Sequence, residues 1–75
     1  MVIIDMKKTG KKIKTLMKKK GLTVKGLALL VGVKRDTVSN WTGGKSLPHI
    51  AILVALSAVF EVPMEDILSY HRVET

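Results

Sequence analysis

Five polar side chains between residues 34 and 40 have the chemistry needed to recognise the edges of DNA base pairs. Lys34 and Arg35 can donate to O6 and N7 of guanine, and Asn40 can bridge N6 and N7 of adenine. Ser39 is adaptable, and Asp36 can accept from cytosine, although next to phosphates we expect it to orient Arg35 instead. We predict these five residues as base contacts, with Arg35 and Asn40 contributing most to discrimination.

A second group of residues flanks this segment and suits contacts with the phosphate backbone. Hydroxyl groups and lysines near the ends of helices donate to phosphate oxygens, and such contacts fix the position of a protein on the duplex. The predicted phosphate contacts are Thr23, Lys25, Thr37, Thr42 and Lys45. The eight lysines of residues 7–20 surround their helix, and we interpret most of them as solvating charge that adds long-range attraction.

Two short helices on either side of a glycine turn must position these side chains. Thr23 is a suitable N-cap for a helix that ends near Val31, and Gly32 stands where the chain must reverse with a positive φ. The next helix is expected over about 34–42, with Lys34 in place of a capping hydroxyl. The apolar positions of both helices face one way: Leu27, Ala28, Val31, Val33, Val38 and Trp41.

This stretch resembles the Cro/C1-type, lambda-repressor-like helix-turn-helix family of DNA-binding domains, over roughly Thr9 to Leu68. The matching residues are Gly21-Leu22-Thr23, Leu27-Ala28, Val31-Gly32-Val33, Arg35, Thr37-Val38-Ser39, Trp41, Gly44-Lys45, Leu47-Pro48, Val62 and Asp66-Ile67-Leu68. The chain departs from the family at Val24, where many members carry a glutamine that contacts phosphate, and at Thr42-Gly43, where Glu-Asn is commoner. The resemblance implies a cytoplasmic, nucleoid-associated protein of bacterial, archaeal or phage origin.

The sequence of residues 1–75 predicts one all-α domain, a compact bundle of about five short helices. Its helix-turn-helix core is expected at about 23–42. The first helix is expected over about 9–20, the fourth from Pro48 to about residue 60, and Pro63 opens the fifth. Helical spacing places Trp41 in the core, and we interpret Phe60 and the four methionines in the same way. The Tyr and Val of the tail 70–75 are expected to pair as a strand with residues 2–4.

The charge of the chain is divided unevenly along its length. The net charge is +7, but residues 1–45 hold 12 basic and 2 acidic residues, whereas residues 46–75 hold 1 basic and 4 acidic residues. Because the basic part contains the helix-turn-helix, this asymmetry favours a polyanionic partner on one side of the molecule. The expected partner is double-stranded DNA, bound in the major groove.

Several other classes of protein are disfavoured by the sequence. The chain has no cysteine, which excludes disulfides and zinc–thiolate sites, and His49 and His71 match no metal-ligand spacing. No nucleophile with a nearby base, no cofactor and no small-molecule ligand is evident, so we do not expect an enzyme. The opening residues have their charges after their apolar residues, the reverse of a secretory signal. The apolar run 50–60 is far shorter than the about 20 residues of a membrane span.

The helix expected over 50–60 is apolar on nearly all sides. A small domain covers only one side of such a helix, so its other apolar side needs a further partner. We predict a two-fold homodimer contact through Ile52, Ala55 and Val59, which would place two recognition helices on a pseudo-palindromic site. An alternative is an antitoxin-like or other interaction module that uses the same surface for a different protein. A membrane-surface module is a further alternative, disfavoured because lysines surround the first helix.

Overall fold

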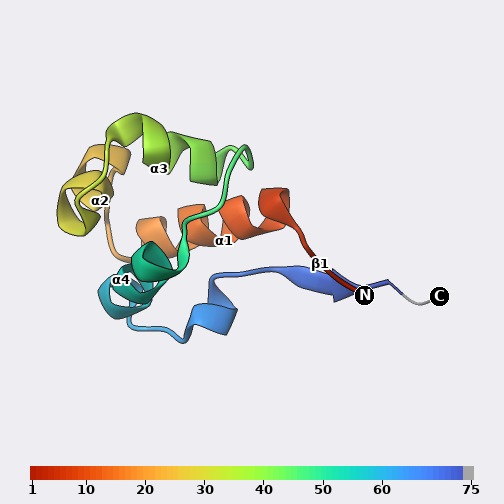
Figure 1. The fold of residues 1–75 in the computed structure, drawn as a ribbon. Helices are drawn as coiled ribbons and strands as arrows, with labels where there is room; N and C mark the ends of the chain where they lie inside the picture. Colours follow the sequence, from red (N-terminus) through yellow and green to blue (C-terminus); the bar gives the residue numbers. More distant parts are fainter. Residues whose placement is uncertain (74–75) are drawn as a thin grey trace.

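The structure is a computed structural model that describes residues 1–73 (Figure 1). In chain order its elements are β1 (Val2–Ile4), α1 (Met6–Lys19), α2 (Val24–Val31), α3 (Arg35–Thr42), α4 (Ile50–Phe60), the 3-10 helix η1 (Met64–Asp66) and β2 (Tyr70–Arg72). The helices form the body of the domain, and the two strands project from it (Figure 1). The predicted helical bundle is therefore confirmed, with a single 3-10 turn in place of the fifth helix and a small added sheet.

Helix α1 begins three residues before the predicted start because Asp5 caps it. The Asp5 carboxylate accepts a hydrogen bond from the Lys8 N–H at 2.9 Å, which satisfies one of the free donors of the first turn. Two further bonds fasten the end of the chain to this turn. The Asp5 N–H donates to the Ser69 carbonyl at 2.8 Å, and the Ser69 N–H donates to the buried Thr9 hydroxyl at 2.9 Å.

Helix α4 begins later than predicted and ends without glycine. Pro48 is buried in the segment before the helix, and His49 at the N-cap position has an extended backbone (φ −74°, ψ 169°), so the helix begins at Ile50. At its other end Glu61 adopts the left-handed conformation (φ 57°) that glycine usually takes. Pro63 is again extended, with ψ 152°, and the chain after it forms one 3-10 turn.

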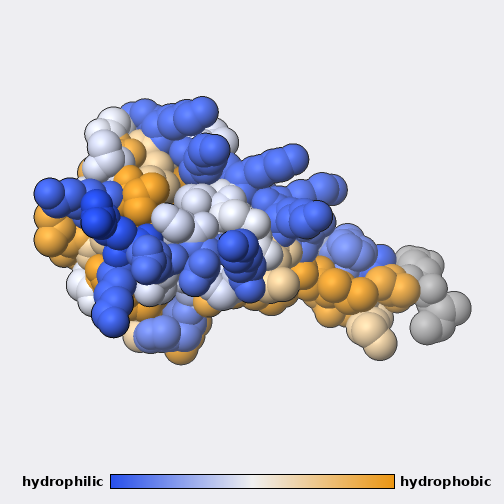
Figure 2. All heavy atoms as spheres, turned by 90° about the horizontal axis from the view of Figure 1, so that it is seen from above, coloured by the Kyte–Doolittle hydropathy of each residue, from blue (hydrophilic) through white to orange (hydrophobic). Residues whose placement is uncertain are grey.

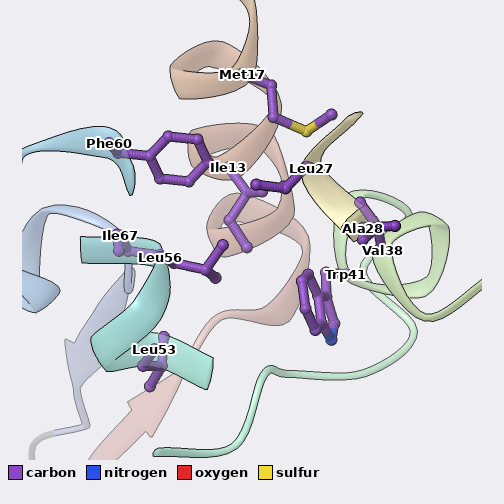
Figure 3. Close-up of a cluster of buried hydrophobic side chains, with 10 residues drawn as sticks. All are labelled: Ile13, Met17, Leu27, Ala28, Val38, Trp41, Leu53, Leu56, Phe60 and Ile67. Carbon is purple, nitrogen blue, oxygen red and sulfur yellow. The ribbon is translucent and has the colours of Figure 1, made fainter. Parts of the chain in front are cut away.

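Every α-helix contributes to a single hydrophobic core (Figure 3). Its buried members are Ile13, Met17, Leu27, Ala28, Val38, Trp41, Leu53, Leu56, Phe60 and Ile67. The predicted core positions of Trp41 and Phe60 are confirmed. The prediction for the methionines was wrong for three of the four, since Met1, Met6 and Met64 are exposed at the sheet, at the start of α1 and in η1.

The two ends of the described chain form an antiparallel strand pair, which confirms the predicted pairing. Its register sets Val2 opposite Arg72, Ile3 opposite His71 and Ile4 opposite Tyr70. Just beyond β2, the Val73 N–H donates to the Met1 carbonyl at 2.7 Å. Residues 74 and 75, which belong to the predicted tail, lie outside the described residues.

Candidate nucleic-acid interface

The turn between α2 and α3 has the predicted geometry. The Thr23 hydroxyl accepts from the Gly26 N–H at 3.0 Å and caps α2. Gly32 ends that helix with φ 74°, and the N–H groups of Gly32 and Val33 both donate to the Ala28 carbonyl, at 2.9 and 3.0 Å. Both bonds satisfy the Ala28 carbonyl in the last turn of α2 while the chain reverses. Helix α3 is thereby set against α2, with Val38 and Trp41 turned into the core.

Loss of the Thr23 cap should cost stability. We expect Thr23→Ala to lower the free energy of unfolding by about 1 kcal/mol, because the Gly26 N–H then lacks its side-chain acceptor. Thr23→Ser keeps the hydroxyl and should remain close to the wild-type protein. Urea unfolding followed by helical circular dichroism measures both variants, and equal midpoints for them would contradict the capping role.

All five predicted base contacts lie on the exposed surface of the helix-turn-helix. Arg35, Asp36, Ser39 and Asn40 recur at helical spacing and line the side of α3 that faces away from the core, and Lys34 directly precedes the helix. Within residues 1–73, no hydrogen bond or ion pair engages these five side chains. The orientation of Arg35 by Asp36 next to phosphates stays a prediction for the DNA-bound state.

The predicted phosphate contacts lie around this face, but not all are equally accessible. Thr23, Lys25 and Lys45 are exposed, whereas Thr37 and Thr42 are half-buried. The Thr42 hydroxyl already donates to the Ser39 carbonyl at 3.2 Å. The exposed residues lie at the start of α2 and just after α3, so they flank the recognition helix.

The loop after α3 is fixed by backbone hydrogen bonds. The Asn40 carbonyl accepts from the N–H groups of Lys45 and Ser46, at 2.9 and 3.4 Å. Gly44 has φ 73°, and a Cβ added there would lie 3.0 Å from the Cα of Lys7 in the first turn of α1. The loop thus packs closely on α1 and holds Lys45 at the end of the recognition helix.

A feature that the sequence analysis missed is the contact between α1 and the end of α3. A Cβ added to the buried Gly10 would lie 2.4 Å from the Trp41 carbonyl oxygen and 2.9 Å from that of Thr42. Only glycine allows the backbones of the two helices to approach so closely. A glycine within the helical pattern of 9–20 was the available signal, because such residues are unfavourable in helices unless packing requires them.

The electrostatic character of this side of the molecule suits a polyanion. Figure 2 looks onto the side that carries α2 and α3 in Figure 1, and hydrophilic side chains cover most of it. In the part of the chain that the structure describes, one ion pair is formed, between Lys20 and Glu61 at 3.0 Å. Among the described residues, the basic side chains of the helix-turn-helix therefore have no carboxylate partner and are available to phosphate.

The family follows from a comparison with known sequence families. The profile of the HTH_3 helix-turn-helix family matches residues 13–67, which include α2, the turn, α3 and the core positions of α4. The chain belongs to the HTH_3 helix-turn-helix family. Members of this Cro/C1-type family are DNA-binding transcriptional regulators and not enzymes. No curated protein matches the chain.

Solved structures of bacterial proteins share the fold. The restriction-modification controller protein C.AhdI from Aeromonas hydrophila superposes with a TM-score of 0.77 at 24% identity, covering 84% of this chain and 96% of the controller. An HTH_3 family transcriptional regulator from Vibrio cholerae superposes with a TM-score of 0.72 at 25% identity, covering 84% of this chain but 35% of the regulator. A transcriptional regulator from Listeria innocua superposes with a TM-score of 0.77 at 24% identity, covering 89% of this chain and 63% of the regulator.

The predicted dimer residues are less exposed than the sequence indicated. Ile52, Ala55 and Val59 are half-buried, and Ile52 and Val59 pack against the core. The large apolar side chains that α4 exposes are Ile50 and Val54, on its outer side.

Across residues 1–73, no helix is of sufficient length and hydropathy to cross a bilayer.

Proposed function

We propose that this HTH_3 domain binds double-stranded DNA sequence-specifically, with α3 in the major groove and α2 crossing above it. The observation that carries the proposal is the exposed side of α3, where the side chains of Arg35, Ser39 and Asn40 have no hydrogen-bond or ion-pair partner among residues 1–73. A helix fits the major groove, and these side-chain types match the donors and acceptors of guanine and adenine. The fixed turn at Gly32 and the fixed loop at Gly44 support a defined docking geometry.

We further propose that the protein acts as a homodimeric regulator of repressor type. A two-fold dimer would present two α3 helices about 34 Å apart and bind a pseudo-palindromic site. The structural neighbours are described as a controller and two transcriptional regulators of bacterial origin, which supports a role at the nucleoid in the cytoplasm. Regulation would follow from occupancy of the site, by blocking or recruiting polymerase.

Selection of bound sequences from random duplexes, repeated at two salt concentrations, tests this function. We expect enrichment of one motif with two related halves, and stronger total binding at the lower salt concentration. Recovery of DNA without any enriched motif would contradict sequence-specific recognition. Failure to retain any duplex at low ionic strength would contradict DNA binding altogether.

Lys45 offers a test of the phosphate contacts. We expect Lys45→Ala to weaken binding to all duplexes by a similar factor and to reduce the slope of log K against log salt by about one. The reason is that an exposed lysine next to Asn40 adds charge without facing base edges. Lys18→Ala, on α1, is the matched control and should change the slope less. A loss confined to particular sequences would contradict the assignment of Lys45 to phosphate.

A second candidate function is an antitoxin-like interaction module. The exposed apolar side chains of Leu29 and Leu30 on α2, and of Ile50 and Val54 on α4, support it. Gel filtration of the chain alone separates the two functions. A stable homodimer favours the DNA regulator, whereas a monomer that associates only with a second protein favours the interaction module.

A further inference from the structure

The terminal strand pair carries an apolar surface that the helical body leaves uncovered. All six strand residues are exposed, and they include Val2, Ile3, Ile4 and Tyr70. The pair extends away from the helices in Figure 1, and its hydrophobic atoms form a continuous patch in Figure 2. An isolated two-stranded sheet of this size is marginal in water and gains stability from additional strands.

In the part of the chain that the structure describes, the outer edge of β1 has unpaired backbone donors and acceptors in a regular pattern. The N–H of Asp5 donates to the Ser69 carbonyl, and the Met1 carbonyl accepts from Val73, so odd-numbered residues of this segment point toward β2. Because successive residues of a strand alternate in direction, the N–H and C=O groups of Val2 and Ile4 point outward. This edge has none of the charges, prolines or bulges that usually protect an exposed strand.

We infer that a second copy of this chain docks on β1 edge to edge, giving a four-stranded antiparallel sheet in the order β2-β1-β1-β2. This inference rests on the homodimer proposed above and names the surface on which it forms. The outward N–H and C=O groups of Val2 would exchange hydrogen bonds with those of the partner's Ile4, and those of Ile4 with the groups of the partner's Val2. The two Ile3 residues would meet at the two-fold axis.

The outer edge of β1 complements itself, because the outward groups of Val2 and Ile4 can pair with the same groups of a second copy, and the lack of charge on this strand favours it as the edge. Two chains of net charge +7 repel each other over most of their surfaces, but Val2, Ile3 and Ile4 carry no charge. Pairing through β2 would instead set His71 against the partner's His71. The β-branched side chains of β1 also favour strand formation and pack well across neighbouring strands. Neither charge repulsion nor conformational preference therefore opposes self-pairing through β1.

Single cysteine variants test the register directly, because the natural chain has no cysteine. In the proposed sheet the two Ile3 residues form a non-hydrogen-bonded pair with Cα atoms about 4.5 Å apart, within the range of a disulfide. The two Val2 residues would lie roughly 8 Å apart, which is beyond that range. Val2 is the matched control, since it is more exposed than Ile3, at 57% against 41%.

We expect mild oxidation of the full chain to convert most of the Ile3→Cys variant to a disulfide-linked dimer and to leave the Val2→Cys variant monomeric. Similar cross-linking of both variants would overturn the register. Cross-linking of Val54→Cys on α4 but not of Ile3→Cys would overturn the inference while leaving the proposed homodimer intact. If all three variants stayed monomeric, and the wild-type chain sedimented as a monomer, the inference and the homodimer would both fail, and DNA selection would still test recognition.

Sedimentation of lysine variants provides a second test that needs no oxidation. Ile3→Lys places two like charges at the two-fold axis, and we expect it to weaken self-association at least about tenfold. His71→Lys adds the same charge to the neighbouring strand, farther from the axis, and should have a smaller effect. Helical circular dichroism confirms that both variants remain folded. Equal weakening by the two variants would overturn the docking on β1.

Discussion

Replacing Gly10 by alanine should destabilise the domain, although the same change in most helices is stabilising. In an open helix the substitution gains up to about 1 kcal/mol of helix propensity. At this position the added Cβ would lie 2.4 Å from the Trp41 carbonyl oxygen, which is a backbone atom and cannot rotate away. Helices α1 and α3 would have to separate, and overpacking of this kind costs about 1–3 kcal/mol or more. We expect a net loss of unfolding free energy of about 1–3 kcal/mol.

Chemical denaturation with Gly26→Ala as the matched control measures this effect. Gly26 also lies inside a helix, but an added Cβ would contact only side chains, the nearest being the Thr23 hydroxyl oxygen at 3.3 Å. We expect the midpoint of Gly26→Ala to stay near or above that of the wild-type protein. A Gly10→Ala variant as stable as Gly26→Ala would show that α1 and α3 do not meet through their backbones as described.

The helix-turn-helix could be predicted because its local signals agree with one another. Thr23 caps, Gly32 turns, and Val38 and Trp41 share a side of α3, so propensity, turn chemistry and apolar spacing all indicate the same structure. The exposure of the predicted base contacts follows from the same spacing. These features depend on residues close together in the chain, which is where sequence patterns are most informative.

The features that were missed depend on contacts between distant segments. The need for glycine at position 10 follows only from the carbonyls of α3, some thirty residues away. A single glycine in a helical pattern does not indicate which segment packs against it. Ile52, Ala55 and Val59 are half-buried whereas Ile50 and Val54 are exposed, and an apolar helix has no polar side from which to infer its orientation. The dimer contact through the first three residues stays a prediction. The start of α1 is a local exception: Asp5 was a possible helix start in the sequence, and it caps a helix that begins at Met6 and not at Thr9.

The largest effect on recognition is expected at Arg35. Its guanidinium lies on the exposed side of α3, among residues 1–73 it has no ion-pair partner, and it can donate two parallel bonds to guanine O6 and N7. A contact of this kind contributes about 1–3 kcal/mol of discrimination against a wrong base, or roughly 5- to 150-fold in relative affinity. Arg35→Ala should lose this preference at one position of each half-site, while binding to unrelated duplexes changes much less.

Arg35→Lys separates the geometry of the contact from its charge. Lysine keeps the positive charge and the salt dependence but lacks the planar fork of arginine. We therefore expect Arg35→Lys to bind unrelated duplexes as the wild-type protein does, and to show a reduced preference at the same position as Arg35→Ala. Competition binding with single base-pair changes across the selected motif measures both properties. If both variants kept the full wild-type preference at every position, Arg35 would not contact a base edge, and recognition would have to depend on Asn40 and Ser39 or on the shape of the duplex.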